Sequence, residues 1–561
     1  MALRNNMRHI LNEESLLNAS SRSASRARTP KVDGEENGQL DINFLSIEEL
    51  LTTKLESLQA LLELQLGQTD DLGMESTSNQ DIRQKQIGQL NKARIQSGLT
   101  TINDIIYSLS LPRNEISSQL RELLLAQLYK LIVSKPLVTY NEENAGSSSY
   151  VSDDKVNELI KIFLSKSYRS DSEFLLMFRS CIALICSDIE EFGYLVSAEF
   201  LGAIQQLLVD PPTSVVTNEN KANLVTGLCS LLLVLHNGSS SFGIDEKVAE
   251  LLDIAEGTAK SALTLSQQLD AGDREYSTLF DANADKQIVN EATQKVRSEV
   301  NFAAATLHGA GCLLTLMPRG SYLNDFISEH MPKLVEMVDD DVNIEVAKAA
   351  GRVIGLCYEV FSYSEEEEDN DDEDEDYNYN APYYEQAALF SVIERLANIS
   401  TKKVSKKERK EAHSIFRDIQ ATLINYTDIE KRTAIYRKSQ EGQELLNSMF
   451  DSTYIKLSKT RSLPINSWFL YLRLIHLKWC FSFGVHNQLV SNDSIRDILR
   501  EPATDYELKY GTSGDHAPDD DAAHHANTSD KYGDDEVKRT QRIRKARVNK
   551  LALEMDELEL R

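Results

Sequence analysis

The chain has 561 residues and a formal net charge of −28 at pH 7, because 88 acidic residues outnumber 60 lysines and arginines. Its 41% apolar, 26% charged and 7% aromatic content is typical of a soluble, helix-rich protein long enough for two or three domains. Such an acid excess opposes binding to nucleic acids and other polyanions, except through a separate basic segment.

The N-terminal sequence predicts no export or membrane insertion. Residues 1–20 contain no apolar core of a signal peptide, and no stretch reaches the roughly 18 consecutive apolar residues of a membrane span. We therefore expect a cytoplasmic protein, with the nucleus as a further location, and no membrane partner. The six cysteines lie in apolar segments without C-x-x-C spacing, so we expect buried thiols rather than disulfides or zinc ligands.

Residues 1–44 and 45–361 differ sharply in composition. The first segment is rich in Ser, Asn, Arg and acids and is predicted to be disordered, because it has too little apolar surface to bury. The second carries apolar residues at three- and four-residue steps, with prolines between the periodic stretches, and no convincing strand pattern. The predicted fold class is all-α. After a helix from residue 46, we expect helices at about 80–111, 115–134, 153–166, 171–187, 192–208, 219–236, 244–270, 286–317, 321–338 and 342–360.

Four cysteines suggest a repeat within residues 45–361. Cys186, Cys229, Cys312 and Cys357 occupy comparable apolar stretches, and successive intervals correspond to one, two and one copies of a period in the range of roughly 40–47 residues. Armadillo and HEAT repeats have this period. We therefore predict an armadillo/HEAT-like array, which presents a long surface to macromolecules and rarely carries catalysis.

An acidic segment at residues 362–382 follows the array. Residues 365–376 are acidic except for one asparagine. Repulsion between like charges favours an extended linker or exposed loop. Binding of histones or other basic partners is the functional alternative.

Residues 383–502 are predicted to form a smaller, helical C-terminal region. Ser405 and Glu408 have the spacing of a capping box, so a helix should begin there and bury Ala412, Ile415, Phe416, Ile419 and Leu423. Cations around a helix N-terminus oppose the helix dipole but suit an incoming phosphate, although a merely solubilising cluster is the alternative. The cations of this cluster are Lys402, Lys403, Lys406, Lys407, Arg409 and Lys410.

A second helix of this region starts after Ser467 and is apolar on two faces. Trp468, Leu472, Ile475 and Trp479 form one stripe, and Leu470, Leu474 and Leu477 form another. We expect this helix to be the core of the region, with His476 packed or partly exposed and Gly484 as its C-cap.

A basic block at residues 538–550 lies near the C-terminus. Residues 503–536 are predicted to be a flexible acidic tether, and residues 537–561 a basic C-terminal helix. As a helix, residues 538–550 would span about 20 Å. Positive charge on all sides of this helix suits a position between several phosphate backbones. A short, self-repelling helix folds only when it binds. Its cations are Lys538, Arg539, Arg542, Arg544, Lys545, Arg547 and Lys550.

The order of these segments resembles the interferon-related developmental regulator family. The resemblance rests on DDDVNIEVAKAAGRVIGLCYEV, KKERKEAHSIFRDI and INSWFLYLRLIHLKWCFSFGVHNQLVSNDSIRDIL, followed by the basic block. Two departures are the polar insertion at residues 504–536 and a helix after Ser467 that is more apolar than the corresponding basic stretch of the family. They leave residues 402–410 and 538–550 as the better candidates for nucleic-acid contact.

The resemblance implies a non-enzymatic factor of translationally inactive ribosomes. The basic C-terminal helix would then block the mRNA and tRNA path of the small subunit by contacting rRNA phosphates. The tRNA sites and other hibernation or translation factors are further partners that the resemblance allows. Family members are also described as transcriptional co-regulators, so a nuclear armadillo-type scaffold that binds regulatory proteins is the alternative.

Catalysis finds no support in the motifs. The sequence has no P-loop, no G-x-G-x-x-G, no H-E-x-x-H and no G-x-S-x-G elbow. We expect no enzymatic activity, no metal, no cofactor and no small-molecule substrate.

Overall fold

The computed structural model describes residues 44–67, 101–137, 150–238, 243–276, 284–338, 343–363, 380–398, 406–440, 453–457 and 462–500. Contacts divide the chain into two compact units. The larger unit includes residues 1–426 and 467–501, and the smaller one residues 427–466 and 502–561. Within the described ranges, no single helix is long and apolar enough to cross a membrane; the pair Ile189–Leu195 and Ala198–Val209 meets that criterion only when taken together, and it is bent by 76°.

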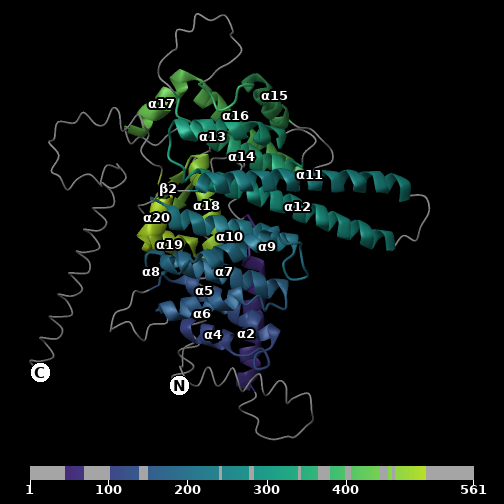
Figure 1. Cartoon of the computed structure of the whole chain (residues 1–561), viewed down its shortest axis with the longest axis vertical. Helices are drawn as coiled ribbons and strands as arrows, with labels where there is room; N and C mark the ends of the chain where they lie inside the picture. Colours follow the sequence, from purple (N-terminus) through teal and green to yellow (C-terminus); the bar gives the residue numbers. More distant parts are fainter. Residues whose placement is uncertain are drawn as a thin grey trace, which may run out of the picture. The chain divides into compact units, whose positions relative to one another are not determined.

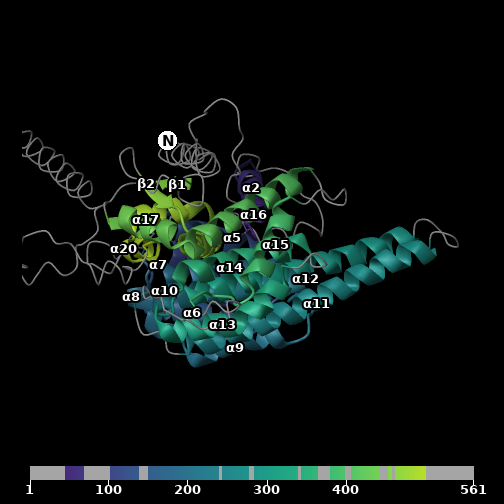
Figure 2. The same ribbon diagram turned by 90° about the horizontal axis from the view of Figure 1, so that it is seen from above.

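The larger unit is built from two rows of helices (Figures 1 and 2). Each outer helix contacts the inner helix that follows it, and each inner helix contacts the next inner helix. The outer row contains α4 (Ile102–Ser110), α6 (Asp153–Leu164), α9 (Ala198–Val209), α11 (Ile244–Tyr276) and α13 (Ser321–Glu336). The inner row contains α5 (Ser118–Ser134), α7 (Asp171–Ser187), α10 (Asn218–His236), α12 (Ala284–Leu314) and α14 (Ile344–Val360).

This stacking of helix pairs confirms the predicted all-α, repeat-like fold. The four cysteines that revealed the period lie one on each of four inner helices, and all are buried. Inner helices bury residues around most of their circumference, because they are covered by an outer helix and by both neighbours. The cysteines therefore mark equivalent positions of successive inner helices. The prediction that the interval from Cys229 to Cys312 contains two copies of the period is wrong, because this interval contains a single helix pair made longer by α11 and α12.

The remaining elements of the larger unit flank these rows. At the N-terminal end, α2 (Glu48–Gly67) contacts α5. Helix α8 (Ile189–Phe192) and the 3₁₀ turn η1 (Gly193–Leu195) separate α7 from α9, where the sequence predicted one helix from 192. Beyond α14 come α15 (Gln386–Ala397) and α16 (Lys406–Thr427), and after the smaller unit come α18 (Trp468–Phe481), η2 (Ser482–Gly484), α19 (Val485–Ser491) and α20 (Asp493–Ile498).

The pair α11 and α12 is longer than the other pairs. With 33 and 31 residues, these helices each span roughly 45–50 Å. Their distal halves project side by side away from the other helices of the unit (Figures 1 and 2). Among the side chains that the structure describes in this hairpin, the buried ones end at Ala262 on α11 and begin at Val300 on α12, so the described residues beyond these positions lie outside the core.

The smaller unit contains α17 (Ile429–Gln440) and an antiparallel hairpin among its described residues. Strand β1 (Thr453–Lys456) pairs with β2 (Ser462–Ile465), with Thr453 opposite Ile465 and Lys456 opposite Ser462. The sequence predicted only helices in this part of the chain. Each strand has four residues, and one of them contains Pro464. The alternation of apolar and polar side chains is therefore too short to be recognised in the sequence.

Candidate functional site

Helix α18 lies across the inner row of the array. It contacts α7, α10, α12 and α14, which lie some 110 to 300 residues earlier in the chain. All its residues are buried, including those of both predicted apolar stripes. A helix that is apolar on every side must be surrounded by other helices. The sequence assigned this helix to a separate region at 383–502, whereas the structure places residues 467–501 in one compact unit with the array.

The N-terminus of α18 is held by an acidic residue of the array. Two carboxylate oxygens of Glu359, on α14, accept hydrogen bonds from the backbone N–H groups of Trp468 and Phe469 at 2.8 and 3.0 Å. The Ser467 hydroxyl accepts another from the N–H of Leu470. The carboxylate and the hydroxyl accept hydrogen bonds from backbone N–H groups that have no partner within the helix. The negative charge of the carboxylate also interacts favourably with the helix dipole.

The C-terminal end of α18 is held by two side chains of the array. The Tyr129 hydroxyl donates to the carbonyl of Cys480 at 2.8 Å, and Arg179 Nη1 donates to that of Trp479 at 3.0 Å. The Arg179 guanidinium also lies 4.3 Å from the centroid of the Trp479 ring. Burial lowers the pKa of Arg179 and raises the pKa of Tyr129. Both groups therefore act as fixed hydrogen-bond donors that anchor the helix.

Small residues on the inner helices let α18 approach closely. A Cβ atom added at Gly355 would lie 2.5 Å from Trp468 Nε1, and one added at Gly227 would lie 2.6 Å from Trp479. Trp468 Nε1 in turn donates to the Thr422 hydroxyl of α16 at 2.8 Å. Both tryptophan rings thus fill space that only glycine leaves open.

The loop after α18 corrects one prediction. The C-cap is Ser482, whose φ is positive at 46°, and not Gly484. Gly484 lies in η2, where an added Cβ would lie 2.0 Å from the carbonyl oxygen of Val133. The glycine is required by this contact with α5, which the local sequence does not reveal.

Two buried histidines lie where α18 crosses α12. His476 Nδ1 is 2.7 Å from the carbonyl of Leu472, and burial lowers the pKa of His476 to about 4. Burial, followed by the nearby charge of Arg352, lowers the pKa of His308 well below its ordinary value. Both side chains are neutral near pH 7, as expected of packed residues.

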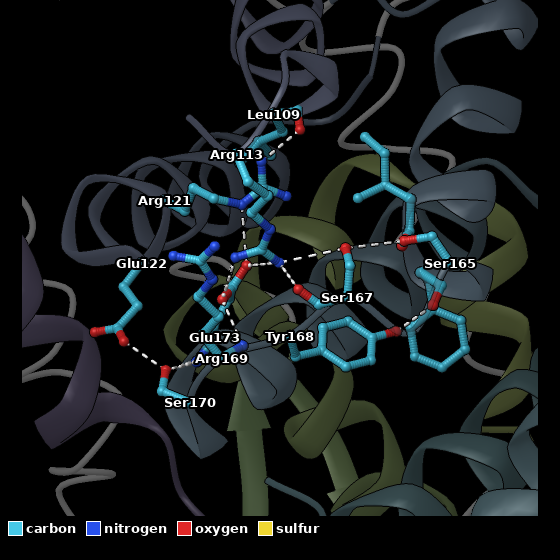
Figure 3. Close-up of polar contacts among 12 residues, drawn as sticks. Leu109, Arg113, Arg121, Glu122, Ser165, Ser167, Tyr168, Arg169, Ser170 and Glu173 are labelled. Atoms are coloured by element: carbon cyan, nitrogen blue, oxygen red, sulfur yellow. Dashed lines mark hydrogen bonds and ion pairs between the residues drawn. The ribbon is translucent and has the colours of Figure 1, made fainter. Parts of the chain in front are cut away.

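A second polar network joins the N-terminal helix pairs (Figure 3). The buried Glu173 carboxylate accepts from Arg113 Nη1 at 2.9 Å, from Arg121 Nε at 3.0 Å and from the N–H of Arg169 at 3.1 Å. Burial alone raises the pKa of Glu173, but hydrogen bonds from Arg113, Arg169 and Arg121 make the net shift downward. The network thereby fixes the α4–α5 connection to the start of α7.

The first basic candidate site surrounds the start of α16. The helix begins at Lys406, directly after the predicted cap Ser405, and its predicted buried face is confirmed, since Ala412, Ile415, Phe416, Ile419 and Leu423 are all buried. Arg409 is half-buried and Lys410 exposed, while Lys402 and Lys403 lie outside the described residues. For Lys406 and Lys407 the structure gives only their place in the helix.

The other basic candidate site has no structural description. Lys538, Arg539, Arg542, Arg544, Lys545, Arg547 and Lys550 lie outside the described residues, as do the acidic run at 365–376 and the tether at 503–536. The proposed rRNA contacts of residues 402–410 and 538–550 therefore stay predictions.

The described part of the chain contains small cavities among its helix rows. It contains no group of three His, Cys, Asp or Glu side chains that could hold a metal ion. One cavity of about 10 Å³ lies between α11, α12, α13 and α14, and another of about 20 Å³ between α9, α10, α11 and α12. Each has room for about one water molecule.

Several anchoring residues were missed in the sequence. The apolar inner helices contain Glu359, Arg179 and Tyr129, and in the sequence these look like ordinary polar residues among apolar ones. A signal was nevertheless present: a charged residue on the buried side of a helix requires a partner. The identity of that partner depends on contacts across hundreds of residues.

Comparison with known proteins agrees with the order of segments seen in the sequence. No curated protein matches the chain. The family described as interferon-related developmental regulator (IFRD) matches residues 71–424, which is more than half of the chain and extends from before α4 into α16. This match confirms the resemblance, and the chain belongs to the interferon-related developmental regulator family.

Proposed function

We propose that this protein is a non-enzymatic factor that binds translationally inactive ribosomes. In this proposal the basic segment at residues 538–550 contacts rRNA phosphates and blocks the mRNA and tRNA path of the small subunit. Family membership and the isolated basic charge of this segment in an acidic chain support the proposal.

The proposal is supported by the position of α18 over the inner row of helices. Solenoid proteins bind macromolecules mainly through their extended concave surface. Here α18 covers the inner helices α7, α10, α12 and α14 and is itself fully buried. A protein partner cannot take this position without unfolding the core, so segments outside the helix rows are the better binding elements. The same position of α18 disfavours a nuclear scaffold that would bind regulatory proteins on the inner row of helices.

The start of α16 provides a second contact in this proposal. Its N-terminal turn carries four of the predicted phosphate-binding cations, Lys406, Lys407, Arg409 and Lys410. Glu411 of the next turn pairs with Lys348 of α14 at 2.8 Å, so this end of α16 is fixed to the array. A rigid support makes a helix N-terminus a better-defined phosphate site than a flexible tail.

Sedimentation of ribosomes tests the proposal. The tagged full-length protein should co-sediment with idle ribosomes and be absent from translating polysomes, whereas retention in the nucleus alone would support the scaffold alternative. Replacing Arg542, Arg544, Lys545 and Arg547 with alanine should weaken binding and reduce the slope of log affinity against log salt by about 3.

A matched control removes four exposed cations from the helix rows. Lys161, Lys260, Lys295 and Arg297 are exposed on α6, α11 and α12. Their replacement with alanine changes the net charge equally and should leave binding nearly unchanged. Equal losses in both variants would mean that net charge alone, rather than the C-terminal segment, determines binding.

A further inference from the structure

The connection between α6 and α7 presents one serine hydroxyl to an arginine. It consists of residues 165–170, with the sequence SKSYRS. Nη2 of Arg113, in the connection between α4 and α5, donates to the carbonyl of Ser167 and lies 3.4 Å from its Oγ atom (Figure 3). Ser165, Lys166 and Ser167 are all exposed, and φ of Lys166 is positive at 51°. The Ser167 hydroxyl is therefore accessible from outside and lies beside a guanidinium.

Three arginines surround one buried carboxylate next to this hydroxyl. Arg113 and Arg121 both form ion pairs with Glu173, at 2.8 and 3.0 Å. Arg169 donates its backbone N–H to the same carboxylate, and its side chain is exposed and forms no ion pair within the described ranges. A guanidinium has five N–H donors and binds oxyanions well, so this group of arginines can hold a further anion.

The other hydroxyl groups of the connection already have structural roles. Ser170 caps α7 and donates to Glu122. Tyr168 and Ser165 donate to carbonyl groups of the α6 segment, from which the connection starts. The Oγ atoms of Ser165 and Ser167 are 3.0 Å apart, so they also form a hydrogen bond. Ser167 is thus the hydroxyl of this connection that has an arginine side chain beside it.

We propose that Ser167 is a phosphorylation site of a protein kinase that recognises basic substrates, and that Arg113 binds the phosphate. Lys166 and Arg169 lie close to the serine in sequence and supply the positive charge that such a kinase recognises. In the reaction, Oγ of Ser167 attacks the γ-phosphorus of ATP held by the kinase, the bond to the β-phosphate oxygen breaks, and ADP leaves. The hydroxyl proton passes to a base of the kinase.

A phosphate at this position would strengthen the link between two helix pairs. Phosphoserine carries a charge of about −1.5 to −2 at pH 7 and three strong acceptor oxygens. Arg113 already contacts both Glu173 and Ser167, and so connects the α4–α5 connection to the start of α7. A charge-assisted pair between its guanidinium and the phosphate adds to this contact. This inference does not depend on ribosome binding.

Phosphopeptide mass spectrometry tests the modification itself. The full-length protein, purified from its own cells during growth and during starvation, should carry phosphate on Ser167 in at least one of the two conditions. A serine that is unmodified in both conditions would overturn the proposal. Phosphate on Ser165 or Ser170 in place of Ser167 would contradict it as well.

Hydrogen–deuterium exchange tests the role of Arg113. Phosphoserine installed at position 167 of the full-length protein by codon suppression should slow amide exchange in residues 111–117 by about threefold or more. In an Arg113→Gln background, the same phosphate should change this exchange by less than about 1.5-fold, because its partner is missing. Arg113→Lys keeps the positive charge and should retain part of the slowing, which shows that the loss in Arg113→Gln is not caused by unfolding.

Phosphoserine at position 261, in place of the exposed Ser261 of α11, is the matched control, since it changes the net charge equally. It should leave exchange in residues 111–117 unchanged. Equal slowing by the two phosphates, or by the Ser167 phosphate with and without Arg113, would overturn the proposal. Faster exchange in the presence of the Ser167 phosphate would also overturn it, because the phosphate would then displace Glu173 from Arg113 instead of adding to the contact.

Discussion

The carboxylate of Glu359 caps the helix that begins at Trp468, 109 residues later in the chain. Replacing this residue with glutamine keeps its shape but removes the charge that complements the dipole of α18. We expect Glu359→Gln to lower the free energy of unfolding by roughly 1–2 kcal/mol. Urea denaturation measures this change. Glu394→Gln, at an exposed site on α15, is the control and should change stability by less than about 0.5 kcal/mol.

Two glycines in helices should respond to alanine in opposite directions. Gly355→Ala places a Cβ atom 2.5 Å from Trp468 Nε1, so it should lower the free energy of unfolding by about 1–3 kcal/mol or more. Gly257, on α11, has no atom within 4 Å of such a Cβ. Gly257→Ala should therefore raise stability by roughly 0.5–1 kcal/mol. Equal effects of both substitutions in thermal unfolding would contradict the close packing of Trp468 on α14.

Acid should weaken the interaction of α18 with the array. Burial lowers the pKa of His476 to about 4, below the ordinary value of 6.5, so the unfolded chain binds a proton more readily than the folded one. The stability that neutral His476 contributes is complete above pH 6.5 and is lost as the pH falls towards 4, by roughly 3 kcal/mol in total. His476→Gln should flatten the dependence of the urea midpoint on pH between 6.5 and 4. An unchanged slope would show that other groups cause it.

The cysteines of the native protein should resist alkylation. Burial raises the pKa of five of the six thiols, among them Cys181, Cys229 and Cys480, and all six are buried and free. A maleimide reacts with exposed thiolates, so it should modify few or none of these cysteines in the native state and all six in denaturant. Mass spectrometry counts the added groups. Fast labelling of Cys480 in the native protein would mean that α18 separates readily from the inner row of helices.

The sequence predicted the helix rows well because their signal is local. Helix α7 begins and ends where the pattern at 171–187 placed it, and α10 differs by one residue at its start. The buried face of α16 follows from spacing alone. The spacing of apolar residues shows which side of a helix is buried, and this does not depend on which element buries it.

The position of α18 could not be predicted in the same way. Its apolar residues on all sides indicated a core helix, but not which helices surround it. The partners of its ends, Glu359 and Tyr129, are fixed only when the array folds. For the candidate binding segments, the sequence identified charge, and the structure adds the support of α16 by Lys348.

The late position of α18 in the chain has a consequence for synthesis. Helix α7 ends at Ser187, and α18 begins only at Trp468, so translation at about 5–20 residues per second leaves roughly 15–55 s between them. During this interval the nascent inner helices expose the apolar surface that α18 later covers. A nascent chain in this state is a natural client for a molecular chaperone, and a premature stop codon before residue 468 should yield an aggregation-prone product even though every helix pair of the array is present.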